Sequence, residues 1–202
     1  MINENKEKCS KDPGFLVQHA ILAENKGEYK QALKLLDKSI AIDPNDPSAH
    51  FWVGMVYNDL DNYEKALSAY NRAIEIYPKL PNAALGKGYS LLKLNRPNEA
   101  VTWYTKAIEI DPMNQEAYVG RGLTRGFVLK DYSAGLADLN KAIQLNGSDA
   151  DAFMQRAFIK TWLNDFAGAC VDIKKVKQLG IKEVIDTRKK VPIDEEIRQI
   201  CT

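Results

Sequence analysis

Histidine and cysteine are the residues of this sequence whose side chains most often carry chemistry. The two histidines, His19 and His50, lie outside any HExxH motif. The three cysteines, Cys9, Cys170 and Cys201, form no CxxC pair, which argues against a zinc site, and their odd number argues against a disulfide framework. The sequence also has no glycine-rich phosphate loop and no GxSxG nucleophile motif. We therefore expect no catalytic residue, no metal site and no cofactor, and we predict that the protein is not an enzyme.

These residues belong to a chain that repeats itself. The stretch 62–78, NYEKALSAYNRAIEIYP, is matched by RPNEAVTWYTKAIEIDP 34 residues downstream. It is matched again by EYKQALKLLDKSIAIDP 34 residues upstream. A constant period of this length indicates an array of helix–turn–helix units.

The repeat divides the chain into a flexible leader, 1–12, five repeats and a tail, 181–202. The repeats are predicted at 13–46, 47–80, 81–114, 115–149 and 150–180. The fourth is one residue longer, and we expect the extra residue in the turn between Gly126 and Asp131, where an insertion costs little. The tail is predicted to form one or two short helices broken at Pro192, which either cap repeat five or enter a groove.

Each position of the repeat has a physical role. Small residues recur where the two helices of a repeat must cross closely. On the second helices these residues are Ala32, Ala66, Ala100, Gly135 and Ala169. Pro44, Pro78 and Pro112 follow the second helices, because proline cannot continue a helix beyond its first turn.

In these positions the chain resembles the tetratricopeptide repeat family over about 13–180. The resemblance implies an all-α fold, a right-handed superhelical solenoid of antiparallel helix pairs. It also implies a concave face that is lined by the first helix of each repeat and binds proteins or peptides. The family's groove positions, carried onto this sequence, predict a peptide-binding groove of apolar residues and two glycines. These residues are Phe51, Trp52, Met55, Leu85, Gly86, Tyr89, Gly120, Leu123, Phe127 and Phe158.

In repeats four and five, an arginine occupies a position that is usually apolar. Arg121 and Arg156 occur in the repeats that also carry Asp138 and Asp172, and the first two repeats have neither member of the pair. This joint occurrence predicts an Arg–Asp ion pair inside each repeat, since a half-buried arginine needs a partner. The alternative is a contact with an anionic ligand. At the same position of repeat three, Lys87 is expected to stack on the Trp103 ring.

Cys170 has two interpretations. It shares a position with Leu33, Leu67, Val101 and Leu136, which predicts a small buried core residue. The alternative is a redox link to Cys201, which requires the tail to fold back onto repeat five.

The overall charge limits the classes of partner. With 28 Lys and Arg against 27 Asp and Glu, the net charge of +1 favours neither nucleic acid nor a membrane surface. The first residues lack the apolar core of a signal peptide, and the cysteines indicate a reducing compartment, so we predict a cytoplasmic location. A signal sequence removed beforehand would leave no trace in the sequence.

The predicted function is a non-enzymatic protein–protein interaction module. It would bind an apolar or amphipathic peptide or helix in its concave groove, as an adaptor or an assembly scaffold. One alternative is a self-associating structural subunit, a homo-oligomer formed through the groove or the tail. Another is a chaperone-like regulator of another subunit.

Overall fold

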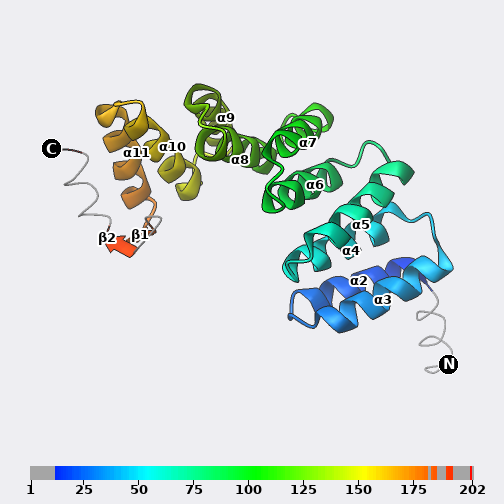
Figure 1. The fold of residues 1–202 in the computed structure, drawn as a ribbon. Helices are drawn as coiled ribbons and strands as arrows, with labels where there is room; N and C mark the ends of the chain where they lie inside the picture. Colours follow the sequence, from blue (N-terminus) through cyan, green and yellow to red (C-terminus); the bar gives the residue numbers. More distant parts are fainter. Residues whose placement is uncertain (1–11, 182, 186–189, 193–200, 202) are drawn as a thin grey trace. The chain divides into compact units, whose positions relative to one another are not determined.

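The computed structural model describes residues 12–181, 183–185, 190–192 and 201. Ten α-helices and one π-helical turn occupy most of this described part (Figure 1). The α-helices are α2 (Pro13–Glu24), α3 (Tyr29–Ile42), α4 (Pro47–Asp59), α5 (Tyr63–Ile76), α6 (Pro81–Lys93), α7 (Pro97–Ile110), α8 (Gln115–Leu123), α9 (Tyr132–Leu145), α10 (Ala150–Trp162) and α11 (Phe166–Gln178). The chain divides into two compact units, Met1–Asp111 and Pro112–Thr202.

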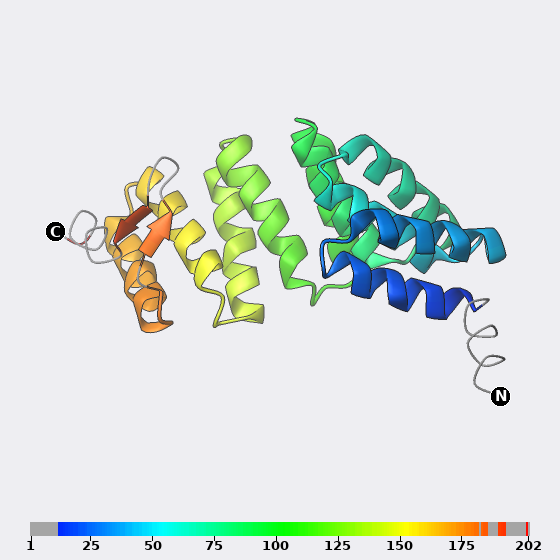
Figure 2. The ribbon, with the colours of Figure 1, turned by 90° about the horizontal axis from the view of Figure 1, so that it is seen from below.

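Within the first unit, α2 to α7 pack as three consecutive pairs (Figures 1 and 2). Proline occupies the first turn of each first helix, where its missing N–H costs nothing. Asp46 caps α4 by accepting a hydrogen bond from the Ser48 amide at 2.9 Å. The second helices α3, α5 and α7 end at Ile42, Ile76 and Ile110, and the residue after each is extended because a proline follows it.

Within the second unit, α8 pairs with α9, α9 packs against α10, and α10 pairs with α11. The small residues at the helix crossings are buried in both units, as the sequence predicts. Gly180 has a φ of 90° and follows the end of α11, so it forms a left-handed cap of that helix.

The extra residue of repeat four lies in a helix and not in the predicted turn. A π-helical turn, η1 (Thr124–Val128), continues α8. The left-handed residues that follow the first helices are Gly27, Asp61, Asn95, Lys130 and Asn164. Successive residues of this set are 34 residues apart, except that Asn95 and Lys130 are 35 apart. The extra residue of repeat four therefore lies before Lys130, and so before the turn between the two helices. The prediction of an insertion between Gly126 and Asp131, in the turn, is therefore wrong, because one wider helical turn absorbs the residue.

The tail also differs from its prediction. Two short strands, β1 (Glu183–Ile185) and β2 (Lys190–Pro192), pair antiparallel with Val184 opposite Val191. These segments are rich in β-branched residues, which favour extended pairing over the predicted short helices. The isoleucines predicted to form one helical face, Ile193, Ile197 and Ile200, lie outside the described residues.

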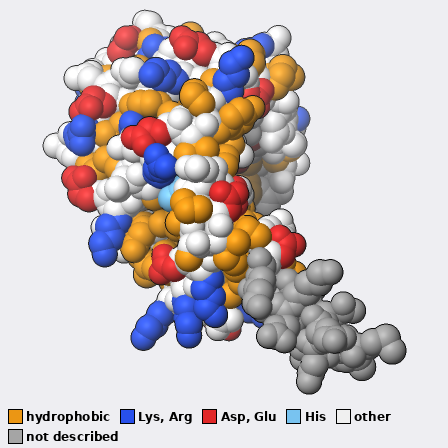
Figure 3. Space-filling model, turned by 90° about the vertical axis from the view of Figure 1, so that its right-hand side faces the viewer, with side chains coloured by type: hydrophobic (Ala, Val, Ile, Leu, Met, Phe, Trp, Pro, Cys, Tyr) orange, Lys and Arg blue, Asp and Glu red, His pale blue; other side chains and the backbone are white. Residues whose placement is uncertain are grey.

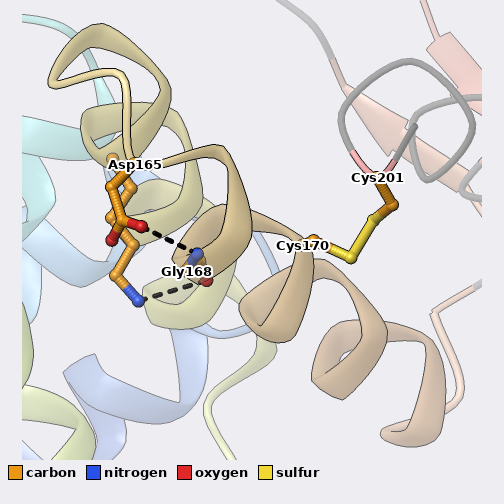
Figure 4. The surroundings of a disulfide bond; sticks show 5 residues. Asp165, Gly168, Cys170 and Cys201 are labelled. Carbon is orange, nitrogen blue, oxygen red and sulfur yellow. Dashed lines mark hydrogen bonds between the residues drawn. A yellow bond between two sulfur atoms is a disulfide. The ribbon is translucent and has the colours of Figure 1, made fainter.

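A disulfide joins Cys170 of α11 to Cys201, with their Cα atoms 5.2 Å apart (Figure 4). The expectation that Cys170 is simply a core residue is therefore wrong, and the alternative link to Cys201 is confirmed. Cys170 is partly buried, like Leu33, Val101 and Leu136 at the same position of earlier repeats. The bond ties the chain beyond β2 back to α11.

Candidate peptide-binding surfaces

The first helices of the first unit carry six of the predicted groove residues. Phe51, Trp52 and Met55 on α4 and Leu85 on α6 are half-buried, because each also packs against a hydrophobic core of the unit. The Phe51 ring lies 5.3 Å from the Trp52 ring, edge to face. Tyr89 on α6 is the most exposed of the six, at 41%. These side chains are therefore partly core and partly surface.

Gly86, which is predicted to line the groove, does not open space for a ligand side chain. It is buried, and a Cβ atom there would lie 2.5 Å from Cζ of Tyr70. Gly54 of the preceding first helix faces the same ring, since a Cβ atom there would lie 2.5 Å from Cε1 of Tyr70. The two glycines therefore make room for a tyrosine of the second helix α5, and this part of the groove prediction is wrong.

The Tyr70 hydroxyl belongs to a buried polar network. It accepts a hydrogen bond from the Asn58 amide nitrogen at 2.9 Å, and the Ser90 hydroxyl donates to the Asn58 oxygen at 2.7 Å. Burial, with a smaller contribution from Asp59, raises the pKa of Tyr70, so its hydroxyl stays protonated. The network joins α4, α5 and α6 and fixes the backbone that carries Tyr89.

In the first unit the exposed ring of Tyr89 meets an aromatic residue of the preceding repeat. Tyr63, at the start of α5, lies 6.3 Å from Tyr89 between ring centroids. Lys93 places its ammonium 5.3 Å from the Tyr89 ring. A hydrogen bond to Asp61, with smaller contributions from its environment, raises the pKa of Tyr63 to about 12.

The second unit repeats this arrangement with larger rings. Trp162, at the end of α10, is 45% exposed, and its ring lies 5.0 Å from Phe127 and 5.3 Å from Tyr132. The Lys130 ammonium lies 5.3 Å from the Trp162 ring. The other predicted residues of this unit, Gly120, Leu123 and Phe158, are half-buried.

Trp162 is not among the ten predicted contacts, although it occupies one of the family's groove positions in repeat five. It lies 35 residues after Phe127, at the same position of the next repeat, and that signal was available without coordinates. We call Phe127, Tyr132 and Trp162 the aromatic cluster of the second unit. On the face drawn in Figure 3, hydrophobic side chains are exposed between charged ones.

The predicted Arg–Asp pairs are confirmed in both repeats. Arg121 donates from Nε and Nη2 to Asp138 at 3.0 and 2.7 Å. Arg156 donates to Asp172 in the same two-pronged way, at 2.8 and 2.5 Å. The aspartates are 6% and 1% exposed, so these are ion pairs of the interior rather than ligand contacts.

Each buried aspartate also binds a second cation that the sequence analysis missed. Arg125 donates to Asp138 at 2.9 Å, and Lys160 donates to Asp172 at 2.8 Å. Both lie four residues after the arginine of their helix and therefore on the same face. That spacing was the available signal.

The expected contact of Lys87 with Trp103 is confirmed. The Lys87 ammonium lies 3.7 Å from the centre of the Trp103 ring, and it also donates to Asn71. Burial, with smaller contributions from nearby Lys106 and Arg96, lowers the pKa of Lys87. This lysine therefore packs within repeat three and also contacts repeat two.

One carboxyl group of the first unit predicts a dependence of stability on pH. Burial, followed by the neighbouring Asp59, raises the pKa of Glu24 above 4.5, so the folded state disfavours its charge. This penalty is absent below pH 4.5 and complete above the folded-state pKa. We expect Glu24→Gln to raise the melting temperature at pH 7 and to leave it nearly unchanged at pH 4.

The matched control is Glu109→Gln, since Glu109 is an exposed acid on α7. This control should not reproduce the difference between pH 4 and pH 7. An equal rise at both pH values in Glu24→Gln would contradict the assignment.

The described residues contain neither a candidate metal site nor a candidate membrane span. No group of three or more His, Cys, Asp or Glu side chains there is arranged to hold a metal ion. No helix in the same part of the chain is long and apolar enough to cross a membrane.

Comparison with known proteins gives matches at the level of the fold. The family model for anaphase-promoting complex, cyclosome, subunit 3, matches residues 25–107. No curated protein matches the sequence. Among solved structures, PilF of Pseudomonas aeruginosa is 18% identical with a TM-score of 0.78, covering 88% of this chain and 79% of PilF.

Two further structures are similar to the same degree. MamA of Desulfovibrio magneticus RS-1, from residue 41 to its end, is 20% identical with a TM-score of 0.73 and covers 83% and 94% of the two chains. YrrB, described as a TPR protein with an unusual peptide-binding site, is 20% identical with a TM-score of 0.68 and covers 88% and 91%.

Proposed function

The chain has the tetratricopeptide-repeat fold with five repeats, and on that premise we propose that it is a non-enzymatic protein-interaction module. Its first helices would bind an apolar or amphipathic peptide or helix, so that the chain acts as an adaptor or assembly scaffold. Helical-repeat scaffolds of this type are suited to protein–protein interaction, because stacked repeats present a long row of side chains.

One observation carries this proposal: two large rings on the first helices stay exposed, and each is held by half-buried aromatic rings. Trp162 is 45% exposed and Tyr89 is 41% exposed. Each meets the tyrosine that begins a second helix of the preceding repeat, Tyr132 or Tyr63. Exposed aromatic rings held by neighbouring rings are typical of residues that dominate binding energy.

The details of the site follow from the contacts of its members. Tyr89, Phe127 and Trp162 are proposed as anchors. The other members of the predicted groove that remain proposed contacts are Phe51, Trp52, Met55, Leu85, Gly120, Leu123 and Phe158. Gly86 is left out, since Tyr70 fills the space beside it.

The experiment is a selection of 12-residue peptides from a phage-displayed random library on the full chain. The selected peptide is then synthesised and titrated against wild type, Trp162→Ala and Tyr89→Ala. We expect the selected peptides to be rich in apolar residues. Replacing a hot-spot anchor with alanine should lower the binding free energy by about 2 kcal/mol, which is roughly a thirtyfold weaker affinity. Affinity should change little with added salt, because the anchors are uncharged.

The matched control is Tyr77→Ala, since Tyr77 is 49% exposed but follows the second helix α5. A selected peptide whose affinity survives both anchor substitutions, or falls equally with the control, would contradict the proposed site. Light scattering over a range of concentrations tests the self-associating alternative. Association that Trp162→Ala or Tyr89→Ala weakens would indicate contact through the groove, and association that both variants leave unchanged would indicate the tail.

A further inference from the structure

Helix α3 carries three lysines in a row on one face. Lys30, Lys34 and Lys38 follow each other at intervals of four residues, so they lie on successive turns. All three are exposed, and none of their side chains forms an ion pair or a hydrogen bond with the described part of the chain. The row spans about 12 Å along the helix axis.

The row is specific to the first repeat. The equivalent residues of the second repeat are Glu64, Ser68 and Arg72, and those of the third are Asn98, Thr102 and Lys106. The fourth and fifth repeats keep a lysine at the last place alone, Lys141 and Lys175. Three lysines in line are therefore not a requirement of the repeat fold.

The row borders a hollow of about 750 Å³ on the surface of the first unit. Besides the three lysines, the hollow is lined by Gly27, Glu28, Tyr29, Gln31, Leu35 and Leu60. Leu60 is 44% exposed, and Leu35 and Tyr29 are half-buried, so part of the lining is apolar. Glu28 is the acidic residue of the lining, which leaves an excess of two positive charges around the hollow.

We propose that this hollow is a second binding site, for an acidic peptide segment of a partner protein that carries aliphatic side chains beside its carboxylates. Carboxylates on one face of a helix, at positions i, i+4 and i+8, would have the same spacing as the lysines. Aliphatic side chains between them would cover Leu35 and Leu60. Unpaired lysines beside an apolar surface complement such a segment in charge and in hydrophobicity. The site is separate from the aromatic anchors and does not depend on them.

The test measures fluorescence anisotropy of a labelled 14-residue peptide of Glu, Leu and Ala, with glutamate at every fourth position, on the full chain in 50 mM salt. A peptide with glutamine in place of every glutamate is the ligand control. We expect the glutamate peptide to bind, and the glutamine peptide to bind at least about tenfold more weakly. Binding should also weaken several-fold at 200 mM salt, since exposed charges are screened.

The variants are Lys34→Glu, at the centre of the row, and Lys34→Gln, which removes its charge without reversing it. Lys79→Glu is the matched control, because Lys79 is an exposed lysine of the same unit outside the hollow. We expect Lys34→Glu to weaken binding at least about tenfold, Lys34→Gln to weaken it less, and Lys79→Glu to change it by less than about twofold.

Three results would overturn the proposal. The first is no binding of the glutamate peptide to wild type at 1 mM, roughly the limit of a weak specific contact. The second is an equal loss of binding in Lys79→Glu, which would indicate a non-specific charge effect. The third is binding to phosphatidylserine vesicles that Lys34→Glu abolishes while the peptide does not bind, which would assign the surface to anionic lipid.

Discussion

Replacing Asp172 with leucine is expected to lower the free energy of unfolding by about 3–5 kcal/mol, because it leaves buried positive charge without its partner. The Asp172 side chain is 1% exposed and lies between Arg156 and Lys160, which are 16% and 15% exposed. After the substitution both cations remain half-buried beside an apolar side chain. Thermal and urea unfolding followed by circular dichroism would measure the loss.

Two further variants separate the charge effect from simple loss of packing. Asp37→Leu is the matched control, since Asp37 is an exposed aspartate on the second helix α3, and it should change stability by less than about 0.5 kcal/mol. Adding Arg156→Met and Lys160→Met to Asp172→Leu should recover most of the loss, because an apolar core can replace a buried ion network. A triple variant as unstable as the single one would contradict this account.

Replacing Gly135 with alanine is the second substitution for which we expect a large effect. A Cβ atom on Gly135 would lie 2.8 Å from Cα and N of Gly126 and 2.9 Å from the carbonyl oxygen of Gly122. These are backbone atoms of α8 and η1, so the helices themselves must move apart. We expect a loss of about 1–3 kcal/mol, although alanine is otherwise the better helix former.

The control for this substitution is Gly14→Ala in α2, where the new Cβ atom would meet Asp12 at an ordinary 3.6 Å. It should leave the melting temperature unchanged or raise it, because alanine costs less backbone entropy in a helix. A Gly135→Ala variant that melts at or above the wild-type temperature would show that the two helices can separate at no cost.

The helices and their ends could be predicted from sequence because they depend on local chemistry. Prolines, capping residues and small residues recur with the period of the repeat, so helix α5 ends at Ile76, shortly before Pro78, as the repeat predicts. The pairing of Arg121 with Asp138 was also predictable, since both residues appear and disappear together between repeats.

The features that the sequence did not predict depend on contacts between repeats, on the path of the tail, or on a choice between two local structures of the same length. Gly86 was assigned to an open groove because the family's positions do not show where the large Tyr70 of the preceding repeat points. The 35-residue length of repeat four revealed an insertion, but a longer turn and a π-helical turn satisfy the same length. The link of Cys170 to Cys201 depends on the path of the tail, which has no repeat to guide it.

The pairwise packing inside each unit has a consequence for how the chain acquires its structure. Each helix contacts mainly the helices next to it in sequence, so native contacts join residues that are close along the chain. Low contact order of this kind is associated with fast folding, since little loop-closure entropy is lost before contacts form. During synthesis each new helix pair can therefore pack on the pairs that have already left the ribosome.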